Sequence, residues 1–147
     1  MCVRFRFRSF HEFRLAASGT SAVEFALLCP LFFLFFFGLT AYGIYLGASH
    51  SIQQIAAEAA RASIAGLDAD ERTSLALHYI SANASHYPLI DPTRVTAQAR
   101  AGEDDPAQFV VSVSFDARAL PIWSLFPGLP LPGTRIEHRS TIRIGGL

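Results

Sequence analysis

An apolar run over residues 25–47 limits the possible folds of this 147-residue chain more than any other stretch. Its ionisable groups are one thiol and two phenols, so a helix of this length crosses the roughly 30 Å hydrocarbon core of a bilayer. One charge, the carboxylate of Glu24, stands at the entrance. An acidic side chain costs about 2.5–3.5 kcal/mol at mid-bilayer and less near the interface. The run therefore predicts a transmembrane helix, and Glu24 needs a physical explanation.

The charges on either side of the run predict its orientation. The leader, residues 1–19, holds four arginines and one glutamate, Glu12, whereas after the run His50 is followed by no charged residue before Glu58. Basic flanks stay in the cytoplasm, so the N-terminus is expected there and the C-terminal part is expected to be exported. The arginines alternate with Phe5 and Phe7, which is compatible with binding nucleic acid or anionic lipid, but a cytoplasmic flank explains them more simply. We therefore expect no nucleic-acid partner.

Glu24 has two interpretations. In the first, residues 25–47 are a signal anchor and the glutamate lies at the headgroup level. In the second, Gly19, four small or apolar residues and then Glu24-Phe25 form a processing motif. This arrangement resembles the processing site of the tight-adherence (Flp pilus) pilins and pseudopilins. The longer sequence Ser-Ala-Val-Glu-Phe-Ala-Leu-Leu-x-Pro resembles the TadE-like pseudopilin family, over about residues 19–65.

The resemblance implies that a prepilin peptidase cuts between Gly19 and Thr20, with Glu24 and Phe25 in the family's glutamate and aromatic positions. Cleavage would leave an α-amino group on Thr20, one helical turn from Glu24, and this amine could pair with the carboxylate within one chain or between neighbours. The resemblance also implies an inner-membrane location with a periplasmic C-terminal domain. The implied partners are the peptidase, other pilins or pseudopilins, and the pilus assembly platform.

On this interpretation residues 1–19 are a basic cytoplasmic leader that is removed. An ordinary signal peptide would have its apolar segment before the cut, and the corresponding weak site here is Leu46-Gly47-Ala48. The apolar run is too long for a signal-peptide core. The two cysteines lie in the leader (Cys2) and in the apolar run (Cys29), so the exported part has no disulfide.

Residues 20–66 are predicted to form one long helix, a pilin-like spine that begins near Thr20 or Ser21 and ends at Gly66. Pro30 lies inside it and is expected to kink it. Gly43 and Gly47 form a Gly-x-x-x-Gly pair, which allows a second helix to approach closely. The alternative is that glycine is simply common in membrane helices. A break near Gly47 is also compatible with the sequence.

Residues 67–147 predict a small exported α+β domain. Asp68 and Glu71 form a capping-box-like start for a short helix to about residue 85, with Leu75, Tyr79 and Ala82 on its apolar stripe and Leu77 and Ile80 beside it. Period-two alternation predicts three antiparallel strands, over residues 93–100, 108–117 and 134–144. The core of such a domain is small.

An apolar segment with four prolines and two glycines, residues 120–133, joins the second and third strands. We expect no regular structure there. Its large side chains, among them Trp123, Leu125 and Phe126, have two interpretations. They either form a contact patch for another subunit or the membrane surface, or fold back to cap the small core.

No catalytic or cofactor-binding pattern is present in the sequence. The five histidines include no pair at zinc-ligand spacing with cysteine or acidic support, and there is no nucleophile elbow and no phosphate-binding loop. We therefore expect neither an enzyme nor a metal, cofactor or small-molecule substrate. The leading hypothesis is a pseudopilin-like structural component of a tight-adherence pilus assembly system. The alternative is a single-pass membrane-anchored periplasmic binding or interaction module unrelated to pili.

Overall fold

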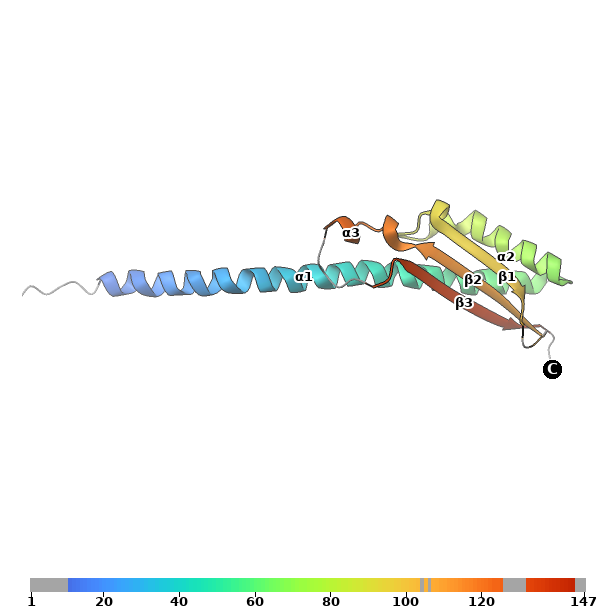
Figure 1. Cartoon of the computed structure of the whole chain (residues 1–147), viewed down its shortest axis with the longest axis horizontal. Coiled ribbons are helices and arrows are strands. Elements are labelled where there is room, and N and C mark those ends of the chain that lie inside the picture. Colours follow the sequence, from blue (N-terminus) through green and yellow to red (C-terminus); the bar gives the residue numbers. More distant parts are fainter. Residues whose placement is uncertain (1–10, 104, 106, 126–131, 145–147) are drawn as a thin grey trace, which may run out of the picture. The chain divides into compact units, whose positions relative to one another are not determined.

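The computed structural model describes residues 11–103, 105, 107–125 and 132–144, with side chains described from Gly19 onwards except at 124 and 125. The chain divides into two compact units, Met1–Leu39 and Thr40–Leu147. Its elements, drawn in Figure 1, are α1 (His11–Ala62), η1 (Ser63–Ala65), α2 (Ala69–Asn83), η2 (Ala84–His86), η3 (Pro92–Arg94), β1 (Val95–Ala101), β2 (Gln108–Asp116), η4 (Ala117–Ala119), α3 (Ile122–Leu125) and β3 (Arg135–Arg143). The predicted α+β class, with a long apolar helix, a short helix and a three-stranded antiparallel sheet, is confirmed.

The start of α1 differs from the prediction. The helix begins at His11, not near Thr20 or Ser21, and it continues through Pro30 and Gly47. The residues before Gly19 include good helix formers, and one interior glycine costs only about 0.8–1.0 kcal/mol relative to alanine. That cost does not end a helix with strong formers on both sides. At the other end, the 3₁₀ turn η1 follows α1, and Gly66 takes an extended conformation, as the predicted stop requires.

The sheet has the order β1-β2-β3, with both pairs antiparallel. In the register of the central strand, Val113 stands between Ala97 of β1 and His138 of β3. The predicted alternation in β2 is confirmed, because one side of the strand is fully buried, namely Phe109, Val111, Val113 and Phe115. The intervening residues are only half-buried, so one face of the sheet is wetted.

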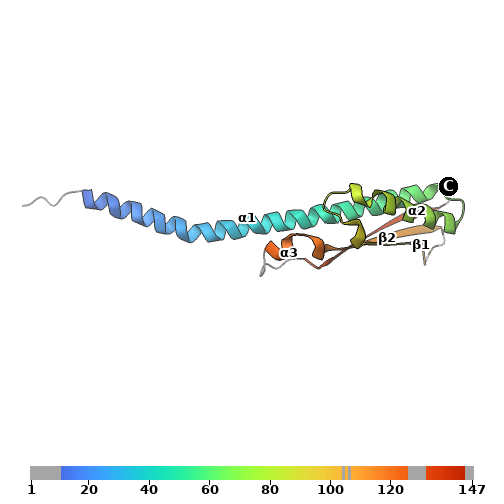
Figure 2. The same ribbon diagram turned by 90° about the horizontal axis from the view of Figure 1, so that it is seen from above.

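Helices cover the buried face of the sheet. Figure 2 shows α2 and the part of α1 that belongs to the second unit on the same side of the strands. The fully buried residues that α1 contributes to the core cluster are small or β-branched: Ala41, Ala48, Ile52, Ile55, Ala56, Ala59 and Ala60. Small side chains let a helix backbone approach its neighbours closely, so this half of α1 is suited to a protein interior.

Helix α2 begins as predicted. The Asp68 carboxylate accepts a hydrogen bond from the backbone N–H of Glu71, and the Glu71 carboxylate accepts one from the backbone N–H of Leu67. The predicted apolar stripe is wrong. Ala76 and Ile80 are buried, whereas Leu77 and Ala82 are exposed.

The reason for this difference is the closeness of the packing around α2. Ala76 is fully buried, and alanine at this position allows a nearer approach than leucine would. Leu75 and Tyr79, which were expected on the stripe, are half-buried at the margin of the contact. Hydrophobicity alone ranks leucine above alanine, which is why the stripe was misplaced.

The proline-rich segment also departs from the prediction, because residues 122–125 form the short helix α3. Pro121 immediately precedes it, and the fixed φ of proline suits the beginning of a helix. The prolines expected to prevent regular structure come later in the sequence or, like Pro121, before the helical turn. One turn therefore forms between them.

Candidate functional site

The predicted processing motif lies on α1. Gly19, Thr20, Glu24 and Phe25 are all exposed, with 70% of Phe25 accessible. A Cβ atom added at Gly19 meets nothing within 4 Å. Packing inside the described part of the chain therefore does not require glycine at this position.

Glu24 forms no hydrogen bond or ion pair with any described residue. It follows Thr20 by four positions, and side chains four residues apart on a helix are neighbours. Among the side chains that the structure describes, from Gly19 onwards, the Glu24 carboxylate therefore has no charged partner. The helical geometry also brings Thr20 to the distance at which a new amino terminus would supply one.

Large apolar side chains project from α1 along the whole of its first half after the motif. Those more than a third exposed are Val23, Phe25, Leu27, Leu28, Leu31, Phe32, Phe33, Leu34, Phe35, Phe36, Phe37 and Leu39. Two phenylalanine pairs stack along the helix, with ring centroids 6.4 Å apart for Phe32–Phe36 and 5.8 Å apart for Phe33–Phe37. Within the residues described, the chain provides no cover for this surface, so lipid or other apolar helices are its natural surroundings.

One helix segment among the described residues, Gly19–Ala65, is long and apolar enough to cross a membrane. Its first half, up to Thr40, is exposed except at the half-buried Cys29 and Gly38. From Ala41 onwards α1 enters the core of the second unit, and Ala41, Ala48 and Ile52 are all fully buried. The continuous run of exposed apolar side chains on α1 therefore ends close to residue 40, and beyond it exposed residues such as Tyr42 and Leu46 alternate with buried ones.

The predicted helix-packing residues have different environments. A Cβ atom at Gly43 meets nothing within 4 Å, but one at Gly47 lies 3.3 Å from the Leu89 side chain of the same chain. Gly47 is therefore already partly covered by the turn that carries Leu89. Pro30 lies exposed inside α1. Packing of a second helix against Gly43 and Gly47 stays a prediction.

The first large residues of the proline-rich segment belong to the core or pack against it. Leu120 and Ile122 are buried, and Trp123 is half-buried and packs against the core. The indole Nε1–H of Trp123 donates a 2.6 Å hydrogen bond to the carbonyl oxygen of Ala117. Leu125 lies on α3, and Phe126 lies outside the described residues. The capping interpretation is thus favoured for Trp123, while the contact-patch interpretation stays open for its exposed part.

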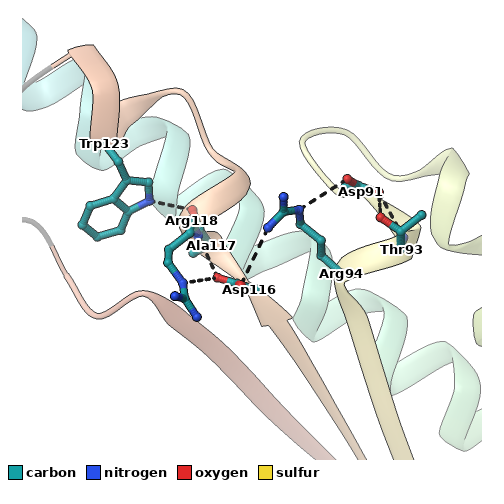
Figure 3. Close-up of polar contacts among 7 residues, drawn as sticks. All are labelled: Asp91, Thr93, Arg94, Asp116, Ala117, Arg118 and Trp123. Atoms are coloured by element: carbon teal, nitrogen blue, oxygen red, sulfur yellow. Dashed lines mark hydrogen bonds and ion pairs between the residues drawn. The ribbon is translucent and has the colours of Figure 1, made fainter.

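A charged group lies directly beside Trp123 (Figure 3). The Arg118 Nε is 3.1 Å from Oδ1 of Asp116, and Arg94 reaches both Asp116 at 3.8 Å and Asp91 at 3.7 Å. Hydrogen bonds from Arg118 lower the pKa of the Asp116 carboxyl. The pKa of Asp91 is lowered mainly by hydrogen bonds from Thr93. Both carboxylates are therefore held ionised at this end of the second unit.

Sequence reasoning missed a polar contact between α1 and the sheet. The Oγ of Ser49 lies 2.8 Å from Nε2 of His138, a residue on the buried side of β3. The alternation of β3 places His138 on the inner face, but nothing local identifies Ser49 as its partner. Among the described residues, no group of three or more histidine, cysteine, aspartate or glutamate side chains lies together as a metal site would require.

These features define the class of protein: a chain with one candidate membrane helix, a processing-like motif at the helix entrance and a small α+β unit behind it. Residues 19–61 match the family model described as TadE-like protein, so the predicted resemblance is confirmed over that stretch. The match suggests involvement in the tight-adherence pilus system and association with a membrane. No curated protein and no solved structure matches the chain.

Proposed function

We propose that this chain is a pseudopilin-like structural component of a tight-adherence pilus assembly system. The supporting observation is the family match over residues 19–61, which covers both the processing motif and the exposed apolar half of α1. In this proposal the chain is held in the bacterial inner membrane, with its N-terminus in the cytoplasm and its C-terminal unit in the periplasm. It acts through assembly with other pilins or pseudopilins and the assembly platform, and it has no enzymatic activity.

A prepilin peptidase cuts this chain after Gly19 in the proposal. The exposure of residues 19–25 and the open space around Gly19 support access by a protease. Since Gly19 lies within α1, the backbone has to unwind locally to enter an extended protease cleft, and glycine lowers the cost of that change. The motif therefore combines a helix former on each side with one residue that opens easily.

Cleavage also explains the charge at the helix entrance. A protonated amino group on Thr20 would stand one turn before Glu24, so the two charges would neutralise each other at the membrane interface. The same amine could instead pair with Glu24 of a neighbouring subunit. Either arrangement removes the need to leave an unpaired carboxylate beside the hydrocarbon.

The test is to co-express the full chain with the prepilin peptidase of the same cell and to determine the N-terminus of the mature protein by mass spectrometry. Wild-type protein should begin at Thr20. Gly19→Val should stay uncut, because a branched side chain obstructs the protease cleft, and cells carrying it should lack pili. Gly38→Val is the matched control, since Gly38 also lies on α1 with nothing within 4 Å of an added Cβ, and it should be cut normally.

Two outcomes contradict the proposal. Retention of Met1 in mature wild-type protein excludes the processing step and leaves a tethered binding module as the better interpretation. Normal piliation in cells that carry only the Gly19→Val chain, shown to be uncut, excludes a role for the processed form in assembly.

A further inference from the structure

The end of the second unit at which α1 enters it is covered by α3. Ala41 is fully buried, although the residues on either side of it, Thr40 and Tyr42, are exposed. Figures 1 and 2 both show α3 beside this stretch of α1, and Ala41, Ile122 and Trp123 belong to the same apolar cluster. Within the second unit, α3 therefore packs near the first residues that α1 contributes to it.

Exposed apolar side chains surround this end of the unit. Tyr42 is 41% exposed and Leu46 is 62% exposed on successive turns of α1, and Leu89, beside Gly47, is 45% exposed. Leu89 has a positive φ of 67°, a conformation that costs an L-residue about 1–2 kcal/mol and that glycine or asparagine adopts more easily. Leu89 is therefore a strained residue whose side chain contacts the Gly47 position on one side and is exposed on the other.

The charges beside Trp123 limit how deeply this end could enter a membrane. The indole donates to the carbonyl of Ala117, whose neighbours in the chain are Asp116 and Arg118. The side chain of Arg118 is 71% exposed, and an ion at the bilayer centre is expensive. Tryptophan and tyrosine are enriched at the headgroup level, where an apolar ring and a polar edge are both accommodated. Aromatic rings next to the charged Arg118 are suited to the membrane–water interface and not to the centre of the hydrocarbon core.

We propose that this end of the second unit rests on the bilayer surface, with Trp123, Tyr42, Leu46 and Leu89 against the lipid headgroup region. The proposal rests on the membrane anchoring that is part of the proposed function. The occupant of the surface is the membrane itself, because the chain passes from the exposed apolar residues of α1 directly into this end of the unit.

Trp123 is the single tryptophan of the chain, so its own fluorescence reports the contact. The full chain is placed in phosphatidylcholine vesicles whose acyl chains carry bromine either near the headgroups or near the bilayer centre. The emission of Trp123 should be quenched by both, and more strongly by bromine near the headgroups. Vesicles are first washed with alkaline carbonate, and the protein should be retained because α1 spans the bilayer.

The matched control is the double variant Trp123→Phe, Leu67→Trp. Leu67 is 88% exposed and follows η1, and α1 alone rises about 30 Å between Ala41 and Ala62 at 1.5 Å per residue. The emission of this variant should be unaffected by either brominated lipid. It carries the same number of tryptophans in the same fold, so a difference between the two proteins reports position alone.

The outcomes separate the two proposals. If carbonate removes the protein from the vesicles, the anchoring in the proposed function is wrong. If the protein is retained but Trp123 emission is unchanged in both lipids, the membrane contact of the second unit is wrong and the anchor stands. Equal quenching of the two reporters also overturns the contact, because the far end of the unit would then lie on the lipid as well.

Discussion

The two halves of α1 are both apolar, but they are built for different surroundings. Between Phe25 and Leu39 most side chains are large and exposed, whereas between Ala41 and Ser63 the inward-facing residues are mainly alanine and isoleucine and are buried. Bulky apolar side chains give a large contact area with a fluid surrounding such as lipid, whereas small ones let two backbones approach closely. Residue size therefore distinguishes the two surroundings, where hydropathy alone does not.

The contrast also explains why one candidate membrane segment, Gly19–Ala65, is longer than a bilayer requires. About 20 residues suffice to span the hydrocarbon core as a helix. The remaining turns belong to the core of the second unit, together with the sheet and α2. We expect the free energy of unfolding of the second unit to depend on substitutions in its core, which the second half of α1 helps to form, and not on substitutions in the exposed half. Three predictions follow, beginning with the core.

The largest effect is expected from Phe115→Ala. Phe115 is fully buried on β2, and truncation of a buried phenylalanine lowers the free energy of unfolding by about 3–5 kcal/mol. Chemical denaturation in detergent, followed by Trp123 emission, measures this value for the second unit. The comparison variant is Phe35→Ala, on the exposed half of α1, where 65% of the side chain is accessible.

Phe35→Ala should change the free energy of unfolding of the second unit by less than about 0.5 kcal/mol, as surface substitutions usually do. Equal losses for the two variants would mean that the exposed half of α1 also supports the fold of the second unit. The contrast between the halves would then be wrong.

The strands were predictable because their signal is local. In β2, Phe109, Val111, Val113 and Phe115 alternate with polar or half-exposed residues, and this spacing identifies both the strand and its buried face. The start of α2 was predictable for the same reason, since Asp68 and Glu71 cap the helix through contacts three or four residues apart. The residues that carry the family resemblance at the helix entrance, 19–25, are likewise adjacent in the sequence, and their processing stays a prediction.

The features that were missed depend on residues far apart in the sequence. The buried face of α2 is set by how closely Ala76 approaches its neighbours, and the Ser49–His138 contact joins α1 to β3. Neither leaves a local pattern. The early start of α1 was not predicted for a different reason: in the resemblance, Gly19 marks a boundary of processing. That boundary is not a boundary of the helix.

A smaller effect is expected from Ala59→Leu in the buried half of α1. Ala59 is fully buried, and additional methylene groups in a well-packed core cost about 1–3 kcal/mol. Gln53→Leu, at an exposed position of the same half, should leave the free energy of unfolding nearly unchanged. The free energy of unfolding of each variant is measured by the same chemical denaturation in detergent. If Ala59→Leu were neutral, close approach of the backbones would not be what small residues provide in this half.

The smallest effect concerns a tyrosine whose phenol is influenced by the buried half of α1. Burial, the hydrogen bond with Tyr79 and the negative charge of Glu58 raise the pKa of Tyr87 from 10.0 to about 12. Folding therefore favours the neutral phenol. The stabilisation from this shift is complete below pH 10.0, where the unfolded chain is also protonated, and it is lost as the pH rises through about 12.

Unfolding midpoints measured between pH 10.0 and about 12 should fall less steeply for Tyr87→Phe than for wild type. Tyr79→Phe, which removes the hydrogen bond but keeps the Tyr87 phenol, should give an intermediate slope, and identical slopes for all three proteins would show that Tyr87 titrates as it does in the unfolded chain.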